Sequence, residues 1–157
     1  MSSIEIIRAE TPEDIASVKA LFLEYLQFVT QYLGQDLSFQ GTEKEFANFP
    51  NTYTALFLAK QNNTAIGACG LKSLTPDIIE LKRLYVTPAG RGLRLGFMLS
   101  EAVVKEARTL DWDYLYLDTD PGLIHANAVY ETLGFKDVPQ YYDNPLAGQS
   151  RYMRLKL

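Results

Sequence analysis

The amino-acid sequence predicts an α/β fold with one mixed, mostly antiparallel twisted sheet and helices on both of its faces. Short apolar runs typical of strands alternate with longer segments whose apolar residues repeat every 3.6 positions, as in helices. The chain of 157 residues is long enough to bury a full core, and its hydrophobic fraction of 47% is ordinary for a globular protein. We therefore expect a single domain over residues 1–157.

The first elements are a short strand and a long helix. Ile4, Ile6 and Ile7 predict the strand. Thr11 and Pro12 form a helix start, with threonine as the N-cap and proline in the first helical position. The apolar face of the helix that follows is formed by Ile15, Val18, Phe22, Tyr25, Leu26 and Val29.

The middle of the chain predicts a short helix and three antiparallel strands. The helix is expected at Thr42–Phe49. Tyr53–Ala59 and Ala65–Leu74 are expected to form a hairpin, because Asn62-Asn63 between them suits a tight hairpin turn. Ile78–Val86 is the next expected strand and closes the antiparallel run.

The C-terminal part predicts two crossover helices and three strands. The first helix opens near Gly96, and its apolar face is formed by Leu95, Leu99, Ala102, Val103, Ala107 and Leu110. Tyr114–Leu117 is a short apolar run of the kind buried in a sheet. Leu123–Leu133 is the second helix, and Gly134 ends it. The last two strands are expected at Phe135–Val138 and Tyr152–Leu157.

Composition argues against several classes of function. A formal net charge of -4 and a pI near 5.0 argue against nucleic acid as a partner, because phosphate neutralisation needs a broad basic surface. One cysteine and one histidine leave no disulfide framework and argue against a metal site. No apolar run reaches membrane-spanning length, and the N-terminus lacks a signal-peptide block. We therefore expect a cytoplasmic protein with no membrane partner.

The segment between the strand Ile78–Val86 and the next helix carries the strongest functional signal. A glycine-bearing turn at such a place directs free backbone N–H groups and the positive end of a helix at one point. From Leu81 to Ser100 there is no acid, but there are four cations, Lys82, Arg83, Arg91 and Arg94. The segment therefore predicts a seat for a phosphate-bearing ligand.

Two motifs give the chain a resemblance to a known family. They are the turn Arg91-Gly-Leu-Arg-Leu-Gly96 and the stretch Ala126-Asn-Ala-Val-Tyr-Glu-Thr-Leu-Gly-Phe135. On these elements and at this separation they resemble the pyrophosphate-binding turn and the Ala-x-x-x-Tyr-x-x-x-Gly-Phe motif of the GNAT superfamily of acyl-CoA-dependent N-acyltransferases. The resemblance covers essentially the whole chain, and the tail Pro139–Pro145 is similar to the ending of a bacterial subgroup of uncertain substrate.

Two positions depart from the family pattern. Arg94 stands where the turn usually has its middle glycine. An arginine there either keeps an ordinary backbone or adopts a left-handed one at a cost of roughly 1 kcal/mol. It also adds a cation beside the phosphates. Leu123 occupies the position of an asparagine in many members, which leaves out one side-chain contact to the pantetheine arm of CoA and does not affect the fold.

The resemblance implies acetyl-CoA as the co-substrate and no metal. Its pantetheine is expected along the end of the strand before the turn, where a backbone N–H would polarise the thioester carbonyl. Its pyrophosphate is expected on the turn. The expected contacts are Leu84, Tyr85, Val86, Arg91, Gly92, Leu93, Arg94, Leu95, Gly96, Asn127 and Tyr130.

Tyr130 and Glu80 are the expected catalytic residues. Tyr130 matches the tyrosine with which family members protonate the leaving thiolate; the alternative is a core tyrosine on an amphipathic helix. Glu80 is placed like the glutamate that histone-acetylating members use as a base through a water. The alternative for Glu80 is an ordinary ion pair with Lys82, two residues along the same face.

The side expected to bind the acceptor combines acids with aromatic rings, which suits a cationic amine. Its expected substrate-binding residues are Tyr25, Asp118 and Tyr142, and the same elements also supply Glu24, Asp120, Tyr141 and Asp143. Solvated carboxylates and packed rings are the alternative interpretation. A homodimer contact through the sheet edges or through Tyr141–Pro145 is compatible with the sequence.

The leading hypothesis is an N-acetyltransferase that moves an acetyl group from acetyl-CoA to the primary amine of a small molecule or peptide, by direct attack in a ternary complex. One alternative is a non-catalytic acyl-CoA binding or sensing module with the same fold. Another is a nucleotide-binding protein, but no Gly-Lys-Ser/Thr follows the turn and the three-glycine dinucleotide pattern is missing.

Overall fold

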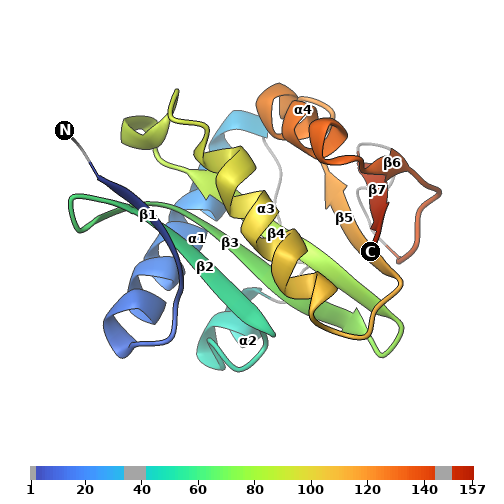
Figure 1. Cartoon of the computed structure of the whole chain (residues 1–157), viewed down its shortest axis with the longest axis horizontal. Coiled ribbons are helices and arrows are strands. Elements are labelled where there is room, and N and C mark those ends of the chain that lie inside the picture. Colours follow the sequence, from blue (N-terminus) through green and yellow to red (C-terminus); the bar gives the residue numbers. More distant parts are fainter. Residues whose placement is uncertain (1–2, 34–41, 144–149) are drawn as a thin grey trace.

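The computed structural model describes residues 3–33, 42–143 and 150–157, whose strands form one mixed sheet (Figure 1). The seven strands of these residues lie in the order β1-β2-β3-β4-β5-β7-β6, and only β4 and β5 are parallel neighbours. The strands are β1 Ile4–Arg8, β2 Ala55–Gln61, β3 Thr64–Thr75, β4 Ile78–Val86, β5 Tyr114–Thr119, β6 Lys136–Asp137 and β7 Arg151–Lys156. The helices are α1 Pro12–Leu33, α2 Thr42–Ala47, the short 3-10 helix η2 Pro88–Gly90, α3 Leu95–Arg108 and α4 Ile124–Leu133. The predicted fold class is confirmed.

Local sequence signals explain where the first elements begin and turn. The backbone N–H of Asp14 donates to Oγ1 of Thr11 at 3.2 Å, so the predicted N-cap of α1 is confirmed. Asn62 and Asn63 have φ angles of 52° and 67°, the left-handed conformation that joins β2 to β3 in a tight hairpin. The predicted short helix is present as α2 and ends before Phe49.

Helices cover both faces of the sheet, and each face has its own core. α3 and α4 lie over one face, where Leu99, Val103 and Leu117 belong to the larger cluster of buried side chains. α1 lies over the other face, where Phe22 and Leu58 are buried in the smaller cluster. Figure 1 shows α3 in front of the sheet and α1 behind it. Side chains that alternate along β4 and β5 therefore reach two different compartments.

β4 and β5 are paired in the sheet only near the first residues of each strand. Their register pairs Ile79 with Leu115 and Glu80 with Tyr116, and no further pair joins them in the described part of the chain. Beyond these pairs β4 continues beside β3 and β5 continues beside β7, and Figure 1 shows the two strands running apart. Past these pairs, the backbone N–H and C=O groups of β4 on the β5 side therefore have no hydrogen-bond partner in the described part of the sheet. Such groups need another partner, which is either a bound molecule or solvent.

β5 is longer than predicted, and only one of its two faces is fully buried. Leu115 and Leu117 are buried on the α3 side, whereas Tyr114 and Tyr116 point to the other face and are half-buried. The predicted strand does lie inside the sheet, between β4 and β7, but only its leucines are fully buried, because rings of the C-terminal segment cover the second face instead of a helix. The ring of Tyr116, for example, lies 4.9 Å from that of Tyr141. β6 is also shorter than the strand predicted there.

Candidate active site

The turn between β4 and α3 depends on close packing. After β4 the backbone N–H of Thr87 donates to the carbonyl of Ile66 at 2.9 Å, and η2 follows. A Cβ atom on Gly90 would lie 2.9 Å from the side chains of both Leu95 and Val86. The missing side chain of Gly90 therefore lets the turn pack onto the core. Motif matching did not assign this residue a role, because it lies outside the glycine pattern of the turn.

Two residues of the turn have left-handed backbones. Gly92 has a φ of 82°, and a Cβ atom there would meet nothing within 4 Å, so the space beside it is open. Arg94 is the N-cap of α3 and has φ 60° and ψ 25°. Arg94 therefore adopts the left-handed backbone conformation, which costs roughly 1 kcal/mol for a residue with a side chain, and not the ordinary one. Its guanidinium lies 5.2 Å from the centre of the Phe97 ring, a cation–π contact that offsets part of the cost.

The start of α3 is electropositive. Arg91 and Arg94 are exposed, and neither forms an ion pair with a residue that the structure describes. The N–H of Met98 donates to the carbonyl of Arg94 at 3.1 Å, so the N–H groups of residues 95–97 precede the helical bonding pattern. Free N–H groups, the helix dipole and two cations thus meet at one point.

The other end of the expected cofactor path is a bulge in β4. One residue of β3, Cys69, faces two residues of β4, Arg83 and Leu84. Leu84 packs toward the α3 side, whereas Tyr85 points to α1, where its hydroxyl donates to Oε2 of Glu24 at 2.6 Å. The bulge shifts the backbone groups of β4 out of the regular ladder just before the turn.

Tyr130 lies on α4, on the α3 side of the sheet. It is 6% exposed, and its ring packs edge-on against Phe135 with centroids 5.8 Å apart. Burial raises the pKa of its hydroxyl well above the ordinary value, so the phenol is protonated at every physiological pH. No described residue forms a hydrogen bond with this hydroxyl. Tyr130 is thus a core residue that keeps an unused O–H donor.

Asn127 lies one helical turn before Tyr130 and is buried. Its Nδ2 donates to the carbonyl of Asp120 at 3.0 Å and to that of Pro121 at 3.4 Å, which holds the loop before α4. Its Oδ1 is buried and has no partner among the described residues. The side chain therefore has a structural role and a free acceptor at the same time. Leu123, the N-cap of α4, supplies no side-chain capping bond.

Glu80 is a buried carboxyl on the opposite face, with 2% of its surface exposed. The hydroxyl of Tyr141 donates to its Oε2 at 2.5 Å, and Nζ of Lys82 lies 3.9 Å from its Oε1. The ion pair considered for Glu80 and Lys82 is therefore present. Burial raises the pKa of Glu80, although the charge of Lys82 and the Tyr141 hydrogen bond oppose the shift.

Asp118 is a second carboxylate, on the same face of β5 as Tyr114 and Tyr116. Its Oδ2 accepts a hydrogen bond of 2.6 Å from Tyr142. Burial raises the pKa of Tyr25 to about 12 and also raises those of Tyr130 and Glu80, and in each case the charge of Asp118 adds to the shift. Glu80 of β4 and Asp118 of β5 thus each accept a hydrogen bond from a tyrosine of the segment between β6 and β7.

Of the expected acceptor residues, Asp118 and Tyr142 are joined by a hydrogen bond, whereas the ring of Tyr25 packs edge-on against Tyr85 with centroids 6.0 Å apart. The other acids expected on this side either form hydrogen bonds elsewhere or are exposed to solvent. Glu24 binds Tyr85, and Oδ1 of Asp120 accepts a hydrogen bond of 2.7 Å from the N–H of Gly122 within the loop before α4. Asp143 is exposed.

The chain also matches known acetyltransferases in sequence. The profile of the Acetyltransferase (GNAT) family matches residues 18–135. The chain belongs to the GNAT acetyltransferase family. An uncharacterized N-acetyltransferase of Schizosaccharomyces pombe is 35% identical over 162 residues, which cover 99% of this chain and 96% of that protein. The family predicted from the two motifs is confirmed, and this GNAT chain is an acyltransferase.

Solved structures agree on the GNAT fold. An acetyltransferase of Streptococcus agalactiae matches with a TM-score of 0.76 and 24% identity, covering 98% of both chains. An acetyltransferase of Salmonella typhimurium with its cofactor acetyl-CoA matches with a TM-score of 0.70 and 16% identity, covering 98% of this chain and 94% of that one. At these identities the likeness concerns the fold.

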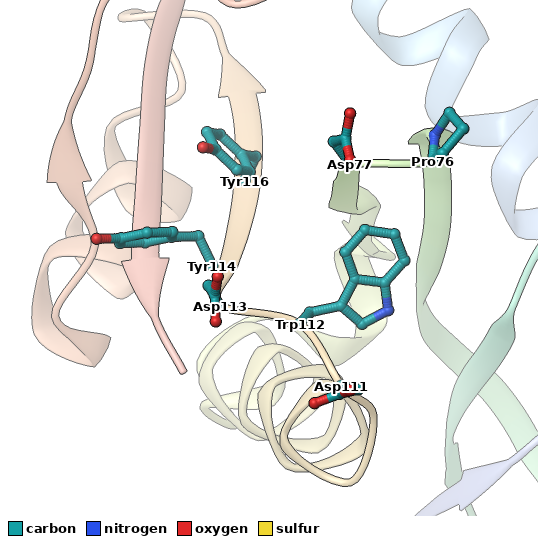
Figure 2. A pocket seen from close by; sticks show the side chains of 7 residues that line it. All are labelled: Pro76, Asp77, Asp111, Trp112, Asp113, Tyr114 and Tyr116. Carbon is teal, nitrogen blue, oxygen red and sulfur yellow. The ribbon is translucent and has the colours of Figure 1, made fainter.

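A pocket of about 340 Å³ lies away from the GNAT turn, near the start of β4 (Figure 2). Its lining residues are Pro76, Asp77, Asp111, Trp112, Asp113, Tyr114 and Tyr116. A strand of the nine residues of β4 spans roughly 26 Å, so the pocket and the turn lie at opposite ends of β4. Trp112, in the loop between α3 and β5, lines this pocket (Figure 2). None of the residues expected to bind acetyl-CoA or the acceptor lines the pocket.

The chain has one histidine and one cysteine. His125 is exposed at the start of α4, and Cys69 is buried, which raises the pKa of its thiol. In the described part of the chain no cluster of three or more His, Cys, Asp or Glu side chains is placed to hold a metal ion. Within the same residues, no helix combines the length and apolar character needed to cross a membrane.

Proposed function

We propose that this chain is an N-acetyltransferase that moves an acetyl group from acetyl-CoA to a primary amine by direct attack in a ternary complex. One observation supports the proposal: a tyrosine hydroxyl with no hydrogen-bond partner among the described residues and a buried carboxyl lie on opposite faces of the sheet, where they would serve as proton donor and proton acceptor. The donor is the free hydroxyl of Tyr130, and the acceptor is the buried carboxyl of Glu80.

The residues present fit acetyl-CoA. The diphosphate would rest on Arg91–Gly96, where the open space beside Gly92 leaves room for it. The pantetheine arm would lie along Leu84–Val86, where β4 has no ladder partner on the β5 side. Two buried oxygens have no partner among the described residues, Oγ1 of Thr87 directly after this end of β4 and Oδ1 of Asn127 on α4. The acetyl-CoA carried by the Salmonella typhimurium structure of the same fold supports the same co-substrate.

A backbone N–H of the β4 bulge would polarise the thioester carbonyl. Negative charge develops on that oxygen during attack, and a fixed N–H donor stabilises it most at that moment. We assign this role to Leu84, one of the two residues that the bulge removes from the regular pairing with β3. Because this role belongs to the backbone, the bulge conformation matters more than the leucine side chain.

The two titratable groups handle the protons. The amine nitrogen attacks the thioester carbon, the C–S bond breaks, and the products are an amide and CoA thiol. Glu80 takes the proton that the nitrogen loses, and Tyr130 gives one to the departing thiolate. The raised pKa of Glu80 makes it a stronger base than an exposed carboxylate. Exchange with solvent then removes the proton from Glu80 and restores the one on Tyr130.

The acceptor would enter on the face of Glu80. Asp118 offers a carboxylate there with Tyr142 bound to it, and Tyr25 offers a further aromatic ring from α1, which covers the same face. A positively charged amine is attracted by both kinds of group before it loses one proton to solvent and becomes the neutral nucleophile; the proton that Glu80 takes is the second one, which leaves as the amide forms. We therefore propose a small or peptidic cationic amine as the acceptor.

Release of free CoA thiol from acetyl-CoA in the presence of a panel of amines tests this function. We expect release only with certain amines, and initial-rate lines that intersect when both substrates are varied, as a ternary complex requires. Parallel lines would indicate an acyl-enzyme and contradict direct attack. Tight acetyl-CoA binding with no thiol release for any amine would favour the non-catalytic binding module.

A further inference from the structure

Arg83 has a backbone conformation that is unusual for its residue type. It lies within β4, yet its φ angle is 59°. A non-glycine residue in this left-handed region costs roughly 1 kcal/mol or more, and persists only where its surroundings hold it. Arg83 and Leu84 are the two residues of the bulge. The strained residue therefore directly precedes the backbone N–H that the proposed function assigns to the thioester carbonyl.

The side chain of Arg83 is anchored on the face opposite to α3. Its Nε lies 3.1 Å from Oε2 of Glu45 and 3.2 Å from the hydroxyl of Tyr53, and a terminal nitrogen donates to Oε1 of Glu45 at 3.4 Å. The guanidinium also lies 5.9 Å from the centre of the Phe46 ring. The side chains of Arg83 and Glu45 are each 2% exposed. A buried ion pair with several hydrogen bonds fixes geometry strongly.

Glu45 is held in place from a second side. Nζ of Lys72, on β3, lies 3.0 Å from Oε1 of Glu45. Burial opposes ionisation of Glu45, but the charges of Arg83 and Lys72 outweigh it and hold its pKa below the ordinary value. The carboxylate of α2 is therefore ionised and bridges β3 to the bulge of β4.

We propose that Glu45 is a positioning residue for acyl transfer. By holding Arg83 it keeps the bulge in the conformation that presents the Leu84 N–H to the thioester carbonyl, an inference that rests on the proposed function. Glycine would adopt the same φ without an anchor. With arginine at this position, the conformation depends on the ion pair, so α2 contributes to catalysis without contacting a substrate.

The test compares Glu45→Gln, Arg83→Gly and the double variant, with Asp14→Asn as the matched control. Asp14 forms a partly buried ion pair of 2.7 Å with Lys60 on the same face of the sheet, away from the bulge. For Glu45→Gln we expect kcat to fall about 10-fold or more, because small misplacements of a polarising group are costly. The KM for acetyl-CoA should change little, since the phosphate turn is separate. The amide resonance of Leu84 should move.

Rescue separates positioning from general stability. Adding Arg83→Gly to Glu45→Gln should restore most of the lost kcat, because glycine keeps the left-handed backbone unaided. A folded Glu45→Gln variant with wild-type kcat and an unmoved Leu84 resonance would overturn the inference, and so would an equal loss in Asp14→Asn. If the wild-type enzyme is active, either of these two results would contradict the positioning role of Glu45 but not the proposed acetyltransferase function. If the wild-type protein releases no thiol with any amine, both the proposed function and the positioning role are contradicted.

Discussion

The hydroxyl of Tyr141 donates a hydrogen bond of 2.5 Å to Oε2 of Glu80, which joins two residues 61 positions apart in the chain. Tyr141 lies between β6 and β7, and its ring packs against Tyr116 of β5. The neighbouring Tyr142 makes the corresponding bond to Asp118. Two consecutive tyrosines thus bind the two carboxylates on the acceptor face. Half-buried phenols that donate to carboxylates favour the ionised form of the acids.

Tyr141→Phe should shift the acid limb of the pH profile of kcat/KM to higher pH. The lost hydrogen bond stabilised ionised Glu80, so the pKa of this carboxyl, already raised by burial, rises further. A base with a higher pKa stays protonated, and therefore inactive, up to a higher pH. The profile of Tyr32→Phe, at an exposed tyrosine of α1, should match that of the wild type. Coinciding acid limbs for Tyr141→Phe and wild type would exclude Glu80 as the titrating base.

Tyr130→Phe should lower kcat by ~10²-fold or more, the usual effect of removing a general acid. The affinity for acetyl-CoA, measured by calorimetry, should stay nearly unchanged. Thermal stability should also change little, because no described residue binds the lost hydroxyl. An active Tyr130→Phe enzyme would leave Tyr130 with its packing role against Phe135 alone.

Gly92→Glu should weaken CoA binding severely without unfolding the protein. The added side chain enters open space, so it clashes with nothing, but it places a negative charge where the diphosphate is proposed to bind. Gly92→Ala is the matched control, because it has the same left-handed backbone cost, roughly 1 kcal/mol, without the charge. Equal affinities of the two variants in calorimetric titration would show that the turn does not hold phosphate.

Gly90→Ala should destabilise the protein by about 1–3 kcal/mol, the range for an overpacked core. Its Cβ atom would lie 2.9 Å from the side chains of Leu95 and Val86 and 3.0 Å from the carbonyl oxygen of Ile66. Chemical denaturation of this variant beside Gly92→Ala measures the difference. If the two variants are equally stable, the turn is looser than the described packing.

Much of the fold could be predicted because its signals are local. Thr11 caps α1, Asn62 and Asn63 turn the hairpin, and Gly134 ends α4 with a φ of 101°. Each signal depends on residues within a few positions of one another. The alternation of β5 was missed because a short run such as Tyr114–Leu117 does not reveal what covers each face of the sheet.

The candidate site was predictable where it follows motifs and hidden where it depends on tertiary contacts. The two GNAT motifs were enough to propose the turn as the diphosphate site and Tyr130 as the proton donor. The pairs Glu45–Arg83 and Glu80–Tyr141 join residues 38 and 61 positions apart, and no spacing rule connects them. The left-handed backbone of Arg83 was equally hidden, because arginine gives no local signal for it.

The most direct measurement is parallel calorimetric titration of the purified protein with acetyl-CoA, CoA, ATP and NAD. We predict binding of acetyl-CoA and CoA, and no response to ATP or NAD. Silence for both CoA species, or a response to ATP or NAD alone, would contradict the proposal that the turn at Arg91–Gly96 serves acetyl transfer.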